Sequence, residues 1–298
     1  MKNATPNAIL KNGKHTKKIF PRTSGYPKPE NHNKKTIMKK FLCIFDAHVG
    51  YELKRTNGKL VKRFSHDQKA LNAVLDFAFD FQPDTVILGG DNMNMGFISR
   101  HTRSKPRIIE GLRAETEYNL FDTKVLEPIE TDLKADELIY MKGNHEAWVD
   151  QFLEENPTIE GLIEPENYLR LIDRGWKVID YGGVYKLGKL HFAHGDNISA
   201  SVKQIAAKAL DMYQRNIVTG HRHTAQIYVS NAMADMDPHI SYVIPTLSHP
   251  DPDYVNQKPT NWVKGFGYGY VADNGNFNLY PVIITKGKFI AEGEEYKG

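Results

Sequence analysis

Thr85-Val86-Ile87-Leu88-Gly89-Gly90-Asp91-Asn92 combines an apolar run with a polar loop, and the architecture of the chain follows from this pairing. The first four residues of this stretch predict a buried strand. The strand is followed at once by two glycines, a carboxylate and an amide, and α/β proteins place their functional loops at such strand ends. The stretch therefore predicts a strand that delivers Asp91 to a site.

The same arrangement recurs along the chain. The apolar run 41–45 ends at Asp46 and His48, and the run 138–141 ends at Gly143-Asn144-His145-Glu146. Later short strands, predicted at 176–179, 184–187, 190–192 and 217–219, lead to His194 and then to His221 and His223. Such strands alternating with helices predict an α/β fold.

Helix signals separate these strands. Ser65 and Gln68 form a capping box ahead of an apolar helical face that ends before Pro83. We expect a mostly helical stretch over 107–133 and a third helical face over 202–213. Asn274-Gly275 predicts a hairpin between strands at 268–272 and 277–284.

Composition restricts the class of protein. The 298 residues are 40% hydrophobic and 25% charged, which is typical of a globular chain and excludes a disordered or fibrous one. Cys43 is the single cysteine, so an internal disulfide framework is excluded. No apolar run approaches the ~18 residues of a membrane span, and the chain starts without an apolar leader segment. We therefore expect a cytoplasmic protein that does not enter a membrane.

The charge is unevenly distributed. Residues 1–40 hold eleven Lys or Arg and one acid, a net charge of +10. The remainder holds 39 − 11 = 28 basic and 36 − 1 = 35 acidic residues, a net charge of −7. We predict a flexible basic extension over 1–40, rich in Asn, Pro and Gly, followed by one domain over 41–298. The extension is either a solvated arm or an electrostatic tether to a polyanion.

Metal-binding side chains gather at the predicted strand ends rather than being scattered. They are Asp46, His48, Asp91, Asn144, His145, His194, His221 and His223. This mixture of carboxylate, imidazole and amide groups suits Mn²⁺, Fe or Zn²⁺ better than an all-oxygen Ca²⁺ site.

The ordered series Asp46-x-His48, Gly90-Asp91-Asn92, Gly143-Asn144-His145-Glu146, His194-Gly195 and Gly220-His221-x-His223 resembles the calcineurin-like metallophosphoesterases. The segment 97–107 further looks like phage-type members described as relatives of DNA repair exonucleases. The resemblance implies a two-sheet β-sandwich flanked by helices, a four-layer α/β fold with metals held in loops at strand ends.

The resemblance also implies how the site is built. Asp46, His48, Asp91 and His223 would hold one divalent ion, and Asp91, Asn144, His194 and His221 the other, so that Asp91 bridges the two. Mn²⁺ is the first expectation for the metal, with Fe or Zn²⁺ as alternatives. A hydroxide bridging the ions would attack phosphorus, and His145 would act as general acid.

One position departs from the family pattern. Many members carry an Asp three residues after the bridging one, where it supports the catalytic histidine, and Asn94 stands there in this chain. The support of His145 is therefore open. We expect Glu146 to stabilise the start of the following helix rather than to take a chemical role.

A basic segment near Asp91 is the candidate substrate contact. No acid occurs from 92 to 109, and Arg100, His101 and Arg103 lie in this stretch. Arg groups suit phosphate oxygens. The alternative is a solvated segment whose charge is balanced by the glutamates that follow it.

Three functional hypotheses remain. The first is a hydrolase that cleaves phosphodiesters, with DNA, RNA or nucleotides as substrates, and hence a nuclease. The second is a phosphomonoesterase acting on phosphoproteins or small metabolites. The third is a binding or scaffold protein that keeps the fold without turnover, but such members usually lose ligands, and no ligand position is lost here. The sequence identifies no protein partner.

Overall fold

The strand predicted at 41–45 forms β1 (Met38–Ile44) in the computed structural model, which describes residues 38–99, 102, 105–230, 237–252 and 260–298. It begins three residues earlier than expected, within the stretch assigned to the basic extension. Residues 1–37 lie outside the described part, so the flexible extension stays a prediction.

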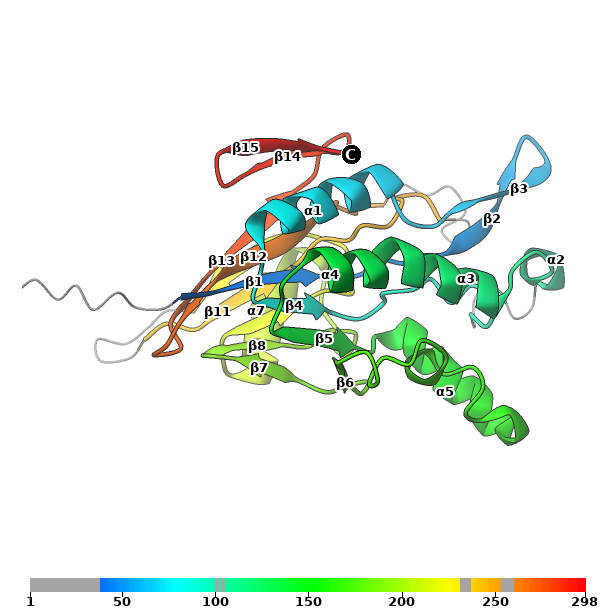
Figure 1. The fold of residues 1–298 in the computed structure, drawn as a ribbon, viewed down its shortest axis with the longest axis horizontal. Coiled ribbons are helices and arrows are strands. Elements are labelled where there is room, and N and C mark those ends of the chain that lie inside the picture. The colour runs from blue at the N-terminus through cyan, green and yellow to red at the C-terminus, as the bar shows by residue number, and fades with distance from the viewer. Residues whose placement is uncertain (1–37, 100–101, 103–104, 231–236, 253–259) are drawn as a thin grey trace, which may run out of the picture. The chain divides into compact units, whose positions relative to one another are not determined.

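The first sheet has six strands in the order β13-β12-β1-β4-β5-β6, with β1, β4, β5 and β6 parallel (Figure 1). β12 joins β1 antiparallel, pairing Gly269 with Phe41. The other strands of this sheet are β4 (Thr85–Leu88), β5 (Glu137–Met141), β6 (Trp176–Ile179), β12 (Gly265–Ala272) and β13 (Phe277–Ile283). The parallel centre brings the carboxyl ends of three predicted strands to one edge.

The second sheet packs face to face on the first. Its order is β10-β11-β9-β8-β7. The strands are β7 (Tyr185–Leu187), β8 (Leu190–Phe192), β9 (Ile217–Thr219), β10 (Gln226–Val229) and β11 (Ile240–Val243). Phe41 and Cys43 from β1 and Phe192 from β8 share one buried cluster, and the Phe41 and Phe192 rings meet edge to face at 5.9 Å. The two sheets therefore form the predicted sandwich.

Helices cover both outer faces. Leu42 and Ile44, on the opposite face of β1, pack with apolar residues of the helices α1, α3, α4 and α5. These helices are α1 (Gln68–Phe81), α3 (Ala114–Phe121), α4 (Glu127–Asp132) and α5 (Asn144–Glu155). On the far side α7 (Ile205–Tyr213) packs on β9 and β11 through Ala209 and Ile217. The layers are helix, sheet, sheet and helix, which confirms the predicted four-layer α/β fold.

The cap of α1 differs from the prediction. Asp67, not Ser65, caps the helix, because its carboxylate accepts from the backbone N–H groups of Lys69 and Ala70. The Ser65 hydroxyl instead donates to the His48 carbonyl at 2.6 Å. A side chain that could have capped the helix thus stabilises a loop of the site.

The stretch 107–133 is broken into shorter pieces. They are α2 (Pro106–Ile109), α3, a π-helical turn (Asp122–Leu126) and α4. Other short elements are α6 (Pro165–Tyr168), β14 (Lys288–Ala291), β15 (Glu294–Lys297) and 3₁₀ turns at Pro157–Ile159 and Val202–Gln204.

A hairpin that the sequence reading missed follows the first site loop. β2 (Tyr51–Thr56) and β3 (Lys59–Phe64) pair antiparallel around Asn57-Gly58. Asn57 and Gly58 have φ of 49° and 76°, and positive φ at both positions is what a two-residue hairpin turn requires. The Asn-Gly pair was therefore the signal for this hairpin.

Within the described residues, none of the helices has both the length and the apolar character needed to cross a bilayer.

Candidate metal centre

Five loops at strand ends bring the predicted metal ligands together. Asp46 and His48 follow β1, Asp91 follows β4, and Asn144 opens α5 after β5. The second sheet supplies the other three, His194 after β8 and then His221 and His223 after β9. The site thus lies where the carboxyl ends of strands from both sheets meet.

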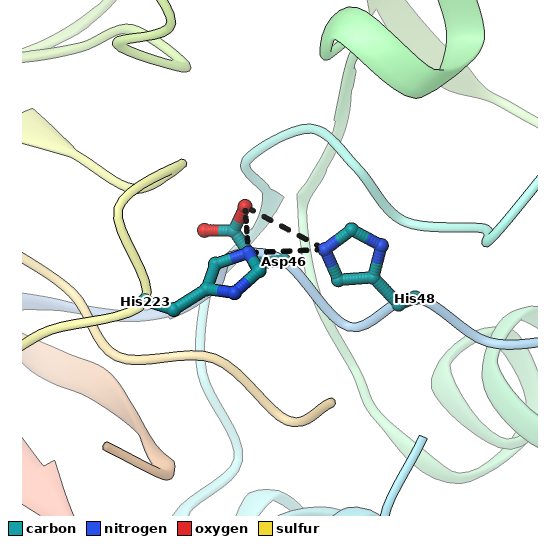
Figure 2. A group of neighbouring side chains, drawn as sticks. All are labelled: Asp46, His48 and His223. Atoms are coloured by element: carbon teal, nitrogen blue, oxygen red, sulfur yellow. Dashed lines mark hydrogen bonds and ion pairs between the residues drawn. The ribbon is translucent and has the colours of Figure 1, made fainter. Parts of the chain in front are cut away.

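Asp46, His48 and His223 form the first group (Figure 2). The Nε2 atoms of His48 and His223 lie 3.1 Å apart. Asp46 Oδ1 is 3.3 Å from His223 Nε2 and 4.0 Å from His48 Nε2. In Figure 2 the two rings and the carboxylate point toward one another, so three potential ligand atoms converge on one small space.

Asp91, His194 and His221 form the second group. Asp91 Oδ2 lies 3.3 Å from His194 Nε2 and 4.0 Å from His48 Nε2, so it faces both groups. The Asn144 amide oxygen is 3.1 Å from His194 Nε2. Asp91 therefore lies between the two groups, and its bridging role stays a prediction.

The ligand loops adopt an unusual backbone. Asp46, His48, Asp91, His221 and His223 all have φ between 47° and 62°, the left-handed region. Residues other than Gly and Asn rarely adopt this backbone conformation. Each one costs about 1–3 kcal/mol of folding free energy and persists only where the surrounding structure holds it. Five of the twelve non-glycine residues with positive φ in the described part of the chain are therefore candidate ligands.

Hydrogen bonds between loops hold this backbone. His48 N–H donates to the Asp91 carbonyl at 2.9 Å, and Asp46 N–H donates to the Gly90 carbonyl at 3.0 Å. His221 N–H donates to Asp46 Oδ2 at 2.7 Å. The loops that carry the two groups are therefore one connected network.

Two glycines allow these loops to approach closely. A Cβ atom on Gly143 would lie 2.3 Å from the backbone nitrogen of Asp91. A Cβ atom on Gly90, whose φ is +96°, would lie 2.6 Å from His194 Nδ1. Larger residues at either position would push Asp91 and His194 apart.

Glu146 links the loop after β4 to the start of α5. Its carboxylate accepts from the backbone N–H groups of Asp91 at 3.0 Å, Asn92 at 2.9 Å and Gly143 at 2.8 Å. The expected role at the helix start is present, but Glu146 also fixes the backbone of the predicted bridging ligand. Burial, assisted by Asp91, raises the pKa of Glu146 to about 7.

His145 is oriented by a main-chain group. Its Nδ1–H donates to the Asn94 carbonyl at 2.8 Å, which turns Nε2 toward Asp91 Oδ2 at 3.8 Å. The Trp148 ring stacks on the imidazole at 3.9 Å between centroids. Asn94, at the position where the family pattern has Asp, therefore supports His145 through its backbone carbonyl instead of through a carboxylate.

The electrostatics divide the histidines into two kinds. Burial and the neighbouring imidazoles hold the pKa of His48 well below its usual range, and burial also lowers the pKa of His145. Burial opposes the charge on His194 too, but the Asp91 carboxylate raises the pKa of His194 to about 10. In the metal-free chain His194 and Asp91 therefore form an ion pair, and a metal would have to displace its proton.

The donor set fits divalent metal ions. Asp46 Oδ1 is buried and accepts no hydrogen bond from the described residues. A buried carboxylate oxygen without a donor is costly, and a cation would satisfy it. Imidazole, carboxylate and amide donors together match first-row ions.

A cleft of about 280 Å³ opens over the two groups. Trp148, Arg222 and Trp262 line it beside the predicted residues, and sequence reasoning did not assign them. Arg222 had a local signal, since it stands between His221 and His223, whereas nothing near the two tryptophans marks them. A larger hollow of about 620 Å³ between α1 and α4 carries no histidine, so the chemistry belongs to the smaller cleft.

The predicted substrate contacts lie in the basic segment that follows Asp91. Arg100, His101 and Arg103 lie outside the described residues, so their contact with substrate stays a prediction. Lys105, from the same basic segment, lines a small pocket that shares His145 and Trp148 with the cleft.

Comparisons with known proteins bear on the family. No curated protein sequence matches the chain. Among solved structures, the NAD nucleotidase of Haemophilus influenzae aligns with 11% identity and a TM-score of 0.35, covering 88% of this chain. The 5'-nucleotidase precursor of Thermus thermophilus aligns with 12% identity and a TM-score of 0.31, covering 82%. This chain spans 54% of the length of each.

A family model gives the assignment. It describes the calcineurin-like phosphoesterases and matches residues 40–255, which include every predicted ligand and His145. The matched range runs from β1 to the end of the second sheet, so it covers both sides of the cleft. The chain belongs to the calcineurin-like phosphoesterase family.

Proposed function

We propose that this protein is a dinuclear metal-dependent phosphodiesterase that cleaves nucleic acid or nucleotides. The observation that carries the proposal is that the candidate ligands gather in two adjoining groups and that five of the seven, together with His145, line one cleft. Asp46, His48, Asp91 and His223 would hold one ion. Asp91, Asn144, His194 and His221 would hold the other, as the donor set and the position of Asp91 support.

Metal ions bound there would supply an activated water for attack on phosphorus and would neutralise charge on the phosphate oxygens. The protein's own task is to keep the ligands in place. The left-handed backbone and the Glu146 hydrogen bonds do this before any ion arrives. A preorganised site loses little free energy to rearrangement during the reaction.

His145 would act on the leaving group. A water oxygen would form the new P–O bond as the old P–O bond breaks. The departing oxygen would take the proton from His145 Nε2, and the proton that the water loses would pass to solvent, from which His145 is protonated again. The hydrogen bond from Nδ1–H to the Asn94 carbonyl fixes the ring so that this nitrogen faces the cleft. The lowered pKa of the imidazole makes it a strong proton donor when protonated.

Substrate cleavage by the metal-loaded protein tests the proposal. Metal-stripped protein is reloaded with Mn²⁺, Fe²⁺ or Zn²⁺ and given end-labelled single- and double-stranded DNA, a simple phosphodiester and a phosphomonoester. Asp91→Ala serves as the blank because it removes the predicted bridging ligand. We expect diester and DNA cleavage in the wild type and none in the blank.

Three outcomes would contradict the proposal. Turnover of the monoester alone would make the protein a phosphomonoesterase acting on phosphoproteins or metabolites. Equal activity in wild type and Asp91→Ala would remove the metal centre from the reaction, and a wild type that retains no metal would favour the scaffold hypothesis.

A further inference from the structure

The β2–β3 hairpin concentrates positive charge within an acidic body. Its fourteen residues, 51–64, hold five basic side chains and one acid, a net charge of 5 − 1 = +4. The whole of 41–298 has a net charge of −7, so the rest of the body without the hairpin has −7 − 4 = −11. A local reversal of sign of this size attracts polyanions to one place on the surface.

The hairpin divides its charges by position. Lys54 and Arg63, half-buried near the base, form ion pairs with Asp251, and Arg63 also pairs with Glu52 at 2.5 Å. The three other basic residues, Arg55, Lys59 and Lys62, are exposed. The ion pairs hold the hairpin against the loop at Asp251, whereas the three exposed side chains are accessible to solvent, with Lys62 Nζ over the Tyr51 ring at 4.2 Å.

The base of the hairpin is fixed to the catalytic loops. Val49 forms a β-bridge with Met93, and the Asn94 side chain donates to the Tyr51 carbonyl at 3.2 Å. The rings of Tyr51 and Phe64 stack at 5.2 Å and close the base. The hairpin is therefore joined to the loop whose carbonyl orients His145.

A small pocket continues from the cleft to the hairpin. Glu52 and Leu53 of β2 line it together with Lys105, His145 and Trp148. In Figure 1 the hairpin extends from the end of the first sheet at which β1 stops, on the same side as α2. The pocket therefore links the cleft, through His145 and Trp148, to the base of the hairpin at Glu52 and Leu53.

The position of His145 identifies which part of the substrate would lie toward the hairpin. If His145 donates its proton to the leaving oxygen, the departing part of a substrate must lie beside it.

Six residues per strand give the hairpin a length of about 20 Å. Along one strand of duplex DNA, with a phosphate about every 3.4 Å, that length spans about six phosphates.

We propose that the β2–β3 hairpin binds the phosphate backbone of a nucleic-acid strand on the leaving-group side of the scissile bond. This inference rests on the proposed function for the placement of the scissile bond, but the binding itself does not depend on turnover. Nucleic acid is favoured over an anionic membrane because Val61 is the one large apolar side chain of the hairpin that is exposed.

A charge-neutralised hairpin tests the inference. Arg55→Gln, Lys59→Gln and Lys62→Gln are combined in one variant of the full-length, metal-loaded protein. The matched control combines Lys186→Gln, Lys288→Gln and Lys297→Gln, which remove the same charge from exposed positions on β7, β14 and β15. Binding of a fluorescein-labelled 20-nucleotide strand with a hydrolysis-resistant phosphorothioate backbone is measured by anisotropy from 50 to 200 mM salt.

We expect the hairpin variant to bind this strand about ten-fold or more weakly at 100 mM salt. The slope of log K against log salt should fall by about 2, since each lost phosphate contact on a single strand removes ~0.7. The control should keep the slope of the wild type. The ratio of kcat/KM for DNA to that for a small diester should fall with the same factor in the hairpin variant.

The contradicting results are distinct from those of the proposed function. Equal losses in the hairpin variant and the control, or binding to phosphatidylserine vesicles in place of DNA, would overturn the inference and leave a diesterase in place. A wild type that binds the strand through the hairpin but hydrolyses no diester would leave the binding inference standing and contradict the proposed function.

Discussion

At the residue scale, Glu146 holds together the two loops that carry Asp91 and Asn144. Both of its oxygens accept backbone hydrogen bonds, Oε2 from Asp91 and Gly143 and Oε1 from Asn92. A glutamine has only one accepting oxygen, so at least one buried N–H group must lose its partner in Glu146→Gln.

We expect Glu146→Gln to lower the free energy of unfolding by about 1–3 kcal/mol. The metal affinity should fall by about 10- to 100-fold because a ligand loses its support. Urea unfolding at pH 6, below the raised pKa of about 7, measures the first effect without the cost of ionising the buried carboxyl, and metal titration at pH 8 measures the second. Glu154→Gln, at an exposed position of the same helix, is the control. Unchanged stability in Glu146→Gln would show that the loops do not depend on it.

His145 acts at the same scale through one nitrogen. We expect His145→Ala to keep its metals and to lose about 10²- to 10⁴-fold in kcat for a substrate with an alkoxide leaving group. A nitrophenolate leaving group needs no proton, so its release should slow much less. His239→Ala, an exposed histidine, serves as control. Equal losses for both substrates would contradict the role of general acid.

Much of the site was predictable residue by residue because each ligand follows an apolar strand directly in the sequence. The contact that orients His145 could not be predicted, because it is made by the backbone carbonyl of Asn94 and every residue has such a carbonyl. The extended role of Glu146 was equally hidden, because its partners are backbone groups some 55 residues earlier. Trp262 reaches the cleft beside His223 from a distant segment.

At the element scale, α3 carries a buried acid beneath the loop that orients His145. Glu117 accepts from the Met95 N–H, and burial raises the pKa of its carboxyl from 4.5 to about 8. The folded state therefore binds the proton more tightly than the unfolded state does. The stability that this group contributes is complete below about pH 4.5 and is lost as the pH rises through about 8.

We expect the metal-free wild type to lose up to about 1.4 kcal/mol of unfolding free energy per pH unit through Glu117 across this range. Glu117→Gln mimics the protonated acid, so its profile should be flatter and it should be the more stable protein at pH 8. Urea unfolding in chelator at several pH values measures this. Glu115→Gln, exposed on the same helix, should follow the wild type. Parallel profiles for Glu117→Gln and wild type would rule out a neutral buried acid.

Elements were predictable where periodicity was strong. The run 41–45 places Phe41 and Cys43 in one core cluster and Leu42 and Ile44 in another, as a strand buried on both faces requires. The hairpin 51–64 was missed because its two strands are largely polar, and only the turn residues Asn57-Gly58 indicate it. The first break within 107–133 contains Gly111, which was a local signal for it, whereas the π-helical turn Asp122–Leu126 contains no glycine or proline that would mark it.

At the scale of the whole molecule, the pairing of strands that are distant in the chain could not be predicted from the sequence. β12 pairs with β1 across more than two hundred residues, and no local pattern in either strand specifies its partner. The sandwich was expected from family resemblance, whereas the strand order of each sheet follows from which apolar faces meet. Charge was different, because the contrast between the basic extension and the acidic body can be counted directly from the sequence.

This contrast gives the last prediction. Residues Thr36–Gly298 form one compact unit, and β1 starts at Met38, so removal of 1–35 leaves every described strand intact. The deletion removes nine basic residues and one acid. We expect it to leave the Tm and the turnover of a small diester unchanged. Binding to a DNA strand should weaken and its salt slope should shrink, because fewer counterions are released.

A second variant separates the effect of the charge of the extension from the effect of its length. A full-length variant with the same nine Lys and Arg changed to Gln keeps the length and should reproduce the weakened binding of the deletion. Calorimetry gives the Tm, and anisotropy across salt concentrations gives the slope. A solvated arm without a binding role predicts the wild-type slope in both variants. A fall in Tm on deletion would instead make the extension part of the folded domain, contrary to the boundary proposed from its composition.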